Sequence, residues 1–241
     1  NVVSGQSRLD YPLIDGVVSG CPSLLLEPQR TNLITYSEDF SNAYWTKTGA
    51  SVTSDATISP DGSLNAFKLV EDTSTGEHII YKIGIAFSSG AILSYSFFVK
   101  EGGRSKIQYY NFVGGGFQNG ADFDLSTGVV SNQFGGLGSM TELDNGWWRC
   151  DFTSLALVGQ TATNVAIRTL DNSSSNSYTG DGTSGVYIYG AQLEQGSYPT
   201  SYIPTNGTTV TRLAETANGA GDATTFNDSE GVLMFEASAL A

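Results

Sequence analysis

Lys106-Ile107-Gln108-Tyr109-Tyr110-Asn111-Phe112 is the stretch that decides the fold class, because its side chains alternate in character along the chain. Successive side chains of a β-strand point to opposite faces of the sheet. In a strand, one face would carry Ile107, Tyr109 and Asn111, and the opposite face would carry Lys106, Gln108, Tyr110 and Phe112. The stretch is therefore predicted to be a strand whose second face bears planar polar and aromatic side chains.

Further strand-sized runs lie on both sides of this stretch. They cover residues 66–70, 78–85, 92–100, 120–125, 147–153, 164–170 and 185–193. Turn signals such as Ser59-Pro60-Asp61-Gly62 and Asp144-Asn145-Gly146 separate them, and no helical run of about 10–15 residues lies between them. This spacing predicts an all-β sandwich.

The composition agrees with this fold class. Charged residues make up 15% of the 241 residues, against about 25% in ordinary domains. Their place is taken by Ser, Thr, Asn and 29 Gly, which disfavour long helices because they compete for backbone hydrogen bonds or lose much entropy on ordering. The net charge of −13 repels phosphate backbones and anionic lipids, so neither nucleic acid nor a membrane is an expected partner.

The two ends of the chain differ from its middle. Residues 1–30 hold Pro12, Pro22 and Pro28 and are predicted to be an extended connector. Residues 31–213 hold the strand pattern and form the predicted domain. Residues 214–241 are predicted to be a linker followed by the first strand of another domain. Because the first residue is not Met, we expect the sequence to be a piece of a longer chain.

Cysteine and histidine counts limit the chemistry. Cys21 and Cys150 form either one disulfide or two buried thiols, and we favour the thiols because the composition is not that of a disulfide scaffold. His78 is the single histidine, so the sequence has no Cys/His spacing typical of a zinc site. The sequence also has no Gly-x-Ser-x-Gly motif that would supply the nucleophile of a catalytic triad with His78. The carboxylate pairs Asp122/Asp124 and Glu71/Asp72 are the nearest in sequence to the pair that a glycosidase needs. A turn-capping role explains Asp124 better than a catalytic role, because it lies in the turn phrase Asp124-Leu125-Ser126-Thr127-Gly128. We therefore do not expect the chain to be an enzyme.

Several phrases occur together in a characteristic order. They are LLLEPQRTNL (24–33), SEDF (37–40) with Trp45, FDLSTG (123–128), NGWWRC (145–150), GVYIYGAQLE (185–194) and PTSYIPT (199–205) with Thr211-Arg212. Together they resemble a module of phage tail, fibre and head-spike proteins, which is itself similar to jelly-roll carbohydrate-binding modules of the family-4 and family-9 kind. The resemblance implies a jelly-roll β-sandwich of two antiparallel sheets, one of them concave, in a virion appendage. It also implies that a laminin-G-like or concanavalin-like domain follows.

Candidate ligand residues follow from the predicted faces. Carbohydrate binding uses flat aromatic rings and planar polar groups that bond to vicinal hydroxyls. We nominate Gln108, Tyr110 and Arg168, with Trp45 and Trp147 as stacking platforms; the alternative for the two tryptophans is a core position. Modules of this kind often hold a structural calcium ion, for which Asp39, Asp181 and Glu194 are candidates. Ordinary turn carboxylates are the alternative that we favour for these three, and no cofactor is required.

Three functions remain open at this point. The first is a non-catalytic adhesion module of a phage appendage that binds host or environmental polysaccharide. The second is a structural spacer or decoration domain of a trimeric fibre, without a glycan ligand. The third is a targeting module of a polysaccharide-degrading enzyme, which would place the chain outside the cell rather than in a virion.

Overall fold

The computed structural model describes residues 8–10, 13–14, 17–18, 23–113 and 116–215. The chain divides into two compact units, one made of Asn1–Arg30 with Thr211–Ala241 and the other of Thr31–Val210. Within the described ranges, the one helical element is the 3₁₀ turn η1 (Asp144–Gly146). None of the described residues forms a helix long and apolar enough to cross a membrane.

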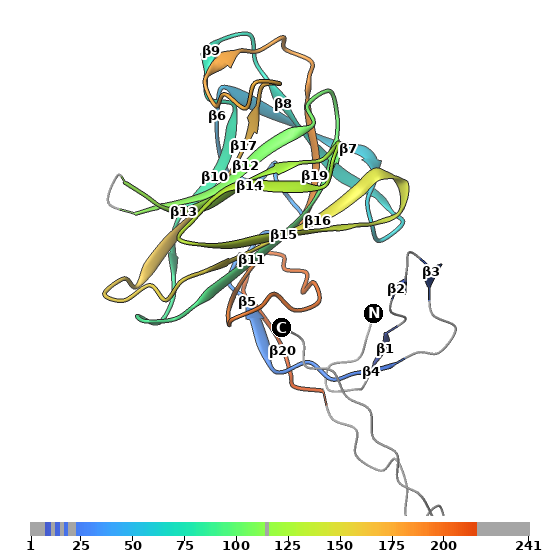
Figure 1. Cartoon of the computed structure of the whole chain (residues 1–241), viewed down its shortest axis with the longest axis vertical. Helices are drawn as coiled ribbons and strands as arrows, with labels where there is room; N and C mark the ends of the chain where they lie inside the picture. The colour runs from blue at the N-terminus through green and yellow to red at the C-terminus, as the bar shows by residue number, and fades with distance from the viewer. Residues whose placement is uncertain (1–7, 11–12, 15–16, 19–22, 114–115, 216–241) are drawn as a thin grey trace, which may run out of the picture. The chain divides into compact units, whose positions relative to one another are not determined.

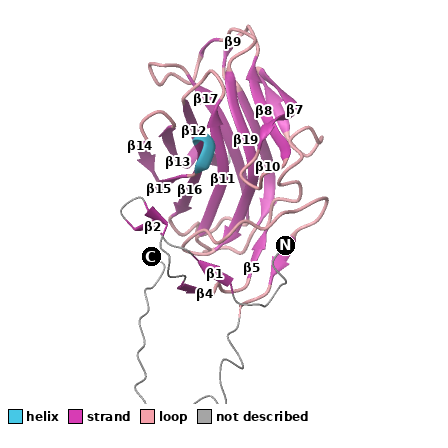
Figure 2. Ribbon diagram, turned by 90° about the vertical axis from the view of Figure 1, so that its right-hand side faces the viewer, coloured by secondary structure: helices cyan, strands magenta, loops and turns pink. Residues whose placement is uncertain are grey.

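The larger unit is a sandwich of two six-stranded antiparallel sheets (Figures 1 and 2). The first, here the β12 sheet, has the order β14 (Val129–Phe134), β13 (Gly116–Asp124), β12 (Lys106–Val113), β17 (Ala162–Leu170), β10 (Ile79–Ala86) and β6 (Thr46–Thr48). The second, here the β11 sheet, has the order β15 (Gly136–Glu142), β16 (Trp147–Ser154), β11 (Leu93–Glu101), β19 (Gly185–Gln195), β8 (Leu64–Glu71) and β7 (Ala50–Ile58).

The chain crosses repeatedly from one sheet to the other, as in a jelly roll. It passes from β10 to β11 and back to β12, and later from β16 to β17 and on to β19. A short sheet of β9 (Thr75–Gly76) and β18 (Tyr178–Thr179) lies outside the two large ones, and β5 (Arg30–Asn32) and β20 (Val210–Arg212) contain the boundaries between the units. The predicted all-β, two-sheet fold is therefore confirmed.

The core lies between the two sheets and is filled by alternate residues of their strands. Ile107 and Tyr109 of β12, with Phe97 and Val99 of β11, are buried there. Side chains at the intervening positions of β12 consequently face outward. This is the alternation that the sequence of β12 predicts, and it leaves Gln108 and Tyr110 on the outer face of the β12 sheet.

Each of the eight predicted runs is a strand, with small differences at its ends. The glycines of Gly135-Gly136-Leu137-Gly138 predict a flexible loop at an edge of the sandwich. This prediction is wrong, because three of the four residues belong to β15. Gly136 and Gly138 fit there because a Cβ at either position would crowd core side chains such as Phe152 and Ala121. The two glycines therefore allow β15 to pack closely against its neighbours and do not make the segment flexible.

Among the described residues of the smaller unit, four short strands lie wholly within it. β1 (Arg8–Asp10) pairs with β4 (Ser23–Leu25), and β2 (Leu13–Ile14) pairs with β3 (Val17–Val18). The expected linker and last strand at 216–241 lie outside the described residues, as does Cys21. Cys150 is a buried free thiol of the core, and burial raises its pKa well above the usual range.

Candidate functional site

The strand register brings polar side chains into one row on the outer face of the β12 sheet. Gln108 of β12 lies opposite Arg168 of β17 on one side and opposite Asp122 of β13 on the other. Asp122 in turn lies opposite Ser131 of β14. Directly opposed side chains of neighbouring strands are close enough to interact, so the row crosses four strands without interruption.

Hydrogen bonds link this row into a continuous chain. Arg168 donates through Nη1 to Oε1 of Glu77 and through Nη2 to Oε1 of Gln108. Gln108 donates through Nε2 to Oδ1 of Asp122, and Asn132 donates to Oδ2 of the same carboxylate at 2.6 Å. Arg168 is 2% exposed. A buried guanidinium is tolerated here because its charge is balanced and hydrogen-bonded.

Aromatic rings continue the face beside the polar row. The guanidinium of Arg168 lies 4.4 Å from the ring centroid of Tyr110, which is 5.8 Å from that of Phe112. The rings of Phe112 and Tyr81 meet edge to face at 6.1 Å. Ala166 lies between Tyr81 and Tyr110 in the register, and its small side chain leaves room for both rings. Burial raises the pKa of Tyr110 to about 12, so its hydroxyl stays protonated near neutral pH.

The combined face has the chemistry of a sugar-binding surface. Tyr81 and Phe112 are half-buried and expose part of their rings. Half-buried Gln108 offers a planar amide whose orientation is fixed by its hydrogen bonds to the buried side chains of Arg168 and Asp122. Rings of this kind contact the apolar side of a pyranose, and fixed planar groups bond to its hydroxyls.

Sequence reasoning found part of this face. It nominated Gln108, Tyr110 and Arg168, and the structure brings all three together. It missed Tyr81 and Asp122 as ligand candidates, because their place beside β12 depends on the register of β10 and β13. Phe112 could have been predicted from sequence, since it follows Gln108 and Tyr110 in the same alternation.

The two nominated tryptophans are core residues, so the prediction of stacking platforms is wrong. Trp45 is 3% exposed and Trp147 is 1% exposed, which leaves neither ring a free face. The indole of Trp45 donates to the carbonyl of Tyr36 at 2.8 Å, and that of Trp147 donates to the carbonyl of Ile58 at 3.0 Å. Both indoles are thus hydrogen-bonded to backbone carbonyls within the fold.

The three carboxylates proposed for calcium each have a local structural role. Asp39 Oδ1 accepts from the backbone and hydroxyl of Ser41, which lowers the pKa of Asp39. Asp181 accepts from Ser184 in the same way, and buried Glu194 accepts from the backbone of Thr200 at 2.8 Å. The described ranges contain no group of three or more His, Cys, Asp or Glu side chains placed for a metal ion. Calcium binding stays a prediction.

The residues weighed for catalysis also have partners within the fold. Buried Glu71 accepts two hydrogen bonds from Arg104 and one from Tyr178. His78 is fully buried and packs against Tyr178 with 4.6 Å between ring centroids and 53° between the ring planes. Asp124 accepts from the backbone and hydroxyl of Ser126, as expected for a turn cap.

Comparison with known proteins gives no family for this chain. No family model and no curated protein matches it. Among the solved structures that do match, one contains the CBM22-1 and GH10 modules of endo-1,4-β-D-xylanase 10B from Clostridium thermocellum, complexed with xylohexaose. It is 14% identical over 74% of this chain and 30% of that chain, with a TM-score of 0.40. The present chain therefore spans about a third of that structure.

Two further matches are shorter proteins. A candidate sugar-binding protein from Bacteroides thetaiotaomicron is 12% identical over 68% of this chain and 92% of its own, with a TM-score of 0.36. The family 11 carbohydrate-binding module from Clostridium thermocellum, in complex with a β-1,3-1,4-mixed-linked tetrasaccharide, is 11% identical over 72% and 99%, with a TM-score of 0.34. The fold assignment rests on the strand order and not on these distant likenesses.

Proposed function

We propose that this chain is a non-catalytic carbohydrate-binding module that contacts a polysaccharide or cell-surface glycan through the outer face of the β12 sheet. The observation that carries the proposal is the hydrogen-bonded row of Arg168, Gln108 and Asp122 beside the half-buried rings of Phe112 and Tyr81. Fixed planar polar groups next to exposed ring edges are what recognition of a hydroxyl-rich ring requires.

The proposed setting is an appendage of a phage virion, where the module would serve adhesion. The ordered phrases of the sequence, from LLLEPQRTNL (24–33) to PTSYIPT (199–205), support this setting by their resemblance to phage tail and fibre modules. A homotrimer is the expected assembly in such a fibre. In a secreted polysaccharide-degrading enzyme the same module would direct a separate catalytic domain to its substrate.

A structural spacer is the second candidate, and one observation favours it. Arg168 is almost completely buried and already bonded to Glu77 and Gln108. Because these groups have hydrogen-bond partners within the protein, the network can also serve a purely structural role and hold β17 and β12 together. In that case the half-buried rings of Tyr81 and Phe112 would pack against a neighbouring subunit.

Glycan binding separates the two candidates. The purified chain would be tested against an array of bacterial and marine polysaccharides, with and without calcium. Saturable binding to one polymer class that is lost in Tyr81→Ala and Phe112→Ala supports the proposal. Tyr187→Ala is the matched control, since Tyr187 is a half-buried tyrosine on the β11 sheet. Folded protein that binds nothing, or binding that the two face variants leave intact, contradicts the proposed site.

A further inference from the structure

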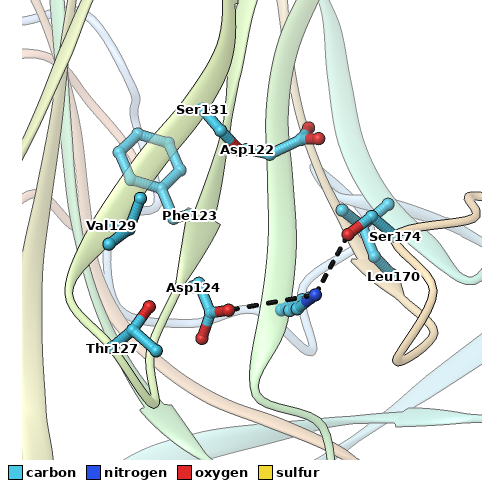
Figure 3. A pocket seen from close by; sticks show the side chains of 9 residues that line it. Asp122, Phe123, Asp124, Thr127, Val129, Ser131, Leu170 and Ser174 are labelled. Carbon is cyan, nitrogen blue, oxygen red and sulfur yellow. Dashed lines mark hydrogen bonds and ion pairs between the residues drawn. The ribbon is translucent and has the colours of Figure 1, made fainter.

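A pocket of about 170 Å³ lies at one end of the candidate face. Figure 3 shows it from close by, with side chains from β13 and β14 on one side and Ser174 and Leu170 on the other. The residues that matter for its chemistry are Lys106, Asp122, Asp124, Thr127, Ser131 and Ser174. None of these belongs to the ligand residues nominated from the sequence.

The pocket marks the place where the sheet stops. Its floor includes Lys106, the first residue of β12, which lies opposite Asp124, the last residue of β13, and opposite Leu170, the last residue of β17. Beyond this row the chain turns, so Thr127 and Ser174 come from loops and line the pocket beyond the strand ends. A ligand that lies along the face from Phe112 toward Lys106 therefore meets the pocket last.

The pocket is joined to the hydrogen-bonded row of the face. Asp122 belongs to both, since it lines the pocket and accepts hydrogen bonds from Gln108 and Asn132. An ionised carboxylate has about four lone-pair positions, so Asp122 keeps capacity for a ligand hydroxyl. The row that orients Arg168 thus extends into the pocket.

Charged groups inside the pocket are held in place. The ammonium of Lys106 donates to Ser174 Oγ and to the carbonyl of Asn172, both at 3.1 Å, and lies 3.9 Å from Asp124 Oδ2. Figure 3 marks the contacts to Ser174 and Asp124 with dashed lines. Burial would raise the pKa of Asp124, but hydrogen bonds from Ser126 outweigh it and the pKa is lowered. One ammonium against two carboxylates gives the pocket a net negative charge, which opposes an anionic ligand.

We propose that this pocket receives the terminal sugar of a neutral glycan chain, whose preceding residues lie along β12 toward the half-buried ring of Phe112. The inference rests on the proposed function. The pocket is smaller than the ~300–1,000 Å³ of sites that enclose a drug-sized ligand, which suits a single sugar ring. Lys106 and Phe112 are six residues apart on one strand, about 20 Å, so several further rings fit along β12. A uronic acid at the terminal position would place its carboxylate against Asp122 and Asp124.

The test fills the pocket while leaving Gln108, Arg168 and the rings of Tyr81 and Phe112 unchanged. Ser131 and Thr127 are exposed, so Ser131→Trp and Thr127→Trp are expected to fold. Ser139→Trp, an exposed serine on β15 of the other sheet, is the matched control. The probes are short cello-, xylo-, manno- and β-1,3-gluco-oligosaccharides, oligogalacturonides, and the parent polymers before and after partial hydrolysis, measured by isothermal titration calorimetry.

Both pocket variants are expected to lower affinity for the bound oligosaccharide about tenfold or more, or ~1.4 kcal/mol, whereas the control keeps the affinity of the wild type. Hydrolysis of the parent polymer is expected to raise the binding capacity per gram, because it creates chain ends. Unchanged affinity in both pocket variants, unchanged capacity after hydrolysis, or preference for oligogalacturonides overturns the terminal-sugar pocket and leaves the proposed function standing. A wild-type chain that binds none of the probes overturns both.

Discussion

Arg168 illustrates how one buried charge determines what its neighbours must be. A guanidinium withdrawn from water is costly unless its charge and its donors are matched. Glu77 supplies the opposite charge, Gln108 supplies an amide oxygen, and the ring of Tyr110 covers the flat side of the guanidinium. The same three contacts fix the plane of Arg168 and require a planar, forked cation at this position.

Arg168→Lys tests this requirement while keeping the charge. A lysine ammonium lacks the planar fork that bonds two partners at once, so the bridge between Glu77 and Gln108 should be lost. We expect glycan affinity to fall about tenfold and the free energy of unfolding to fall by ~1–3 kcal/mol. Titration calorimetry and urea denaturation measure the two effects. Arg149→Lys on the β11 sheet, where Arg149 bonds Asp151 at 2.9 Å, is the control and should leave affinity unchanged.

Glu71 gives a prediction about pH. Burial would raise the pKa of this carboxyl group, but hydrogen bonds from Arg104, Asp181 and Tyr178 outweigh it, so the pKa is lowered in the folded protein. A lowered folded-state pKa contributes stability that is present above the unfolded value, about 4.3, and is lost as pH falls through the folded value. Wild-type protein should therefore lose this contribution in acid.

Glu71→Gln should remove that contribution at every pH. At pH 7 we expect a loss of about 3 kcal/mol, since one partner of a buried ion pair is neutralised. The difference between wild type and variant should shrink as the pH is lowered below about 4. Urea unfolding at a series of pH values measures it, with exposed Glu101→Gln as the control. A constant difference across the acid range would contradict the assigned pKa direction.

The tryptophans show where residue-level reasoning from sequence stops. An indole in a binding face and an indole in a core have the same local sequence signature. The buried position of Trp147 depends on Ile58, which is 89 positions away in sequence and whose carbonyl accepts a hydrogen bond from the indole. No feature of the sequence near Trp147 predicts such a contact. The outward position of Gln108 can be predicted, because seven consecutive residues of β12 show the alternation.

At the scale of elements, central strands could be predicted and edge strands could not. β11 and β19 are almost continuously buried, and their sequences are correspondingly apolar and aromatic. β14 at one edge has five exposed residues of six, and β7 at another edge is similarly open. An edge strand without a buried face has no hydrophobic alternation, so nothing in its sequence distinguishes it from a loop.

Gly190 gives a prediction at this scale, because it forms an irregularity in β19. Its φ is 62°, and the pairing with β11 shifts register between Ser96 and Phe98, opposite it. A Cβ at Gly190 would lie 2.9 Å from the ring of Phe98 and 3.3 Å from that of Tyr202. Gly190→Ala should therefore combine backbone strain with crowding.

We expect Gly190→Ala to lower the free energy of unfolding by about 2–3 kcal/mol, from ~1 kcal/mol of backbone strain and ~1–2 kcal/mol of crowding. Gly84→Ala separates the two causes, since Gly84 has a φ of 73° but nothing within 4 Å of the added Cβ. That variant should lose only about 1 kcal/mol. Equal losses in chemical denaturation of the two variants would show that crowding by the two rings contributes nothing.

At the scale of the whole molecule, the candidate face is a product of the assembled sheet. Its parts come from Glu77, Tyr81, β12, β13 and Arg168, which are spread over more than ninety positions of the chain. The sequence predicts which side of each strand is outward, but the register that brings Asp122 beside Gln108 is fixed only by pairing. Gln108, Tyr110 and Arg168 could be proposed from sequence, whereas Tyr81, Asp122 and the arrangement of the face could not.

The autonomy of the sandwich depends on residues 31–37, which begin with the last two residues of β5. Asn32 is fully buried, and its amide donates to the carbonyls of Ala191 and Ile203 at 3.2 and 2.9 Å. Its Oδ1 accepts from the backbone of Leu193 at 3.1 Å, and Ile34 is buried in the core two positions later. This segment therefore satisfies buried backbone groups of β19 and of the chain that follows it.

Trimming the chain tests this role. A chain of residues 31–210, the larger compact unit, should unfold cooperatively at nearly the temperature of the full sequence and keep its affinity for the glycan. A chain of residues 38–210 lacks Asn32 and Ile34, whose loss should cost ~2–5 kcal/mol for the isoleucine and ~1–3 kcal/mol for buried groups left unpaired. Such a sum approaches the ~5–15 kcal/mol that stabilises a whole domain, so this shorter chain should be largely unfolded. Circular dichroism and calorimetry measure whether each chain is folded. A stable 38–210 chain would mean that residues 31–37 do not contribute to the stability of the sandwich. An unfolded 31–210 chain would mean that the larger unit needs the rest of the sequence to fold.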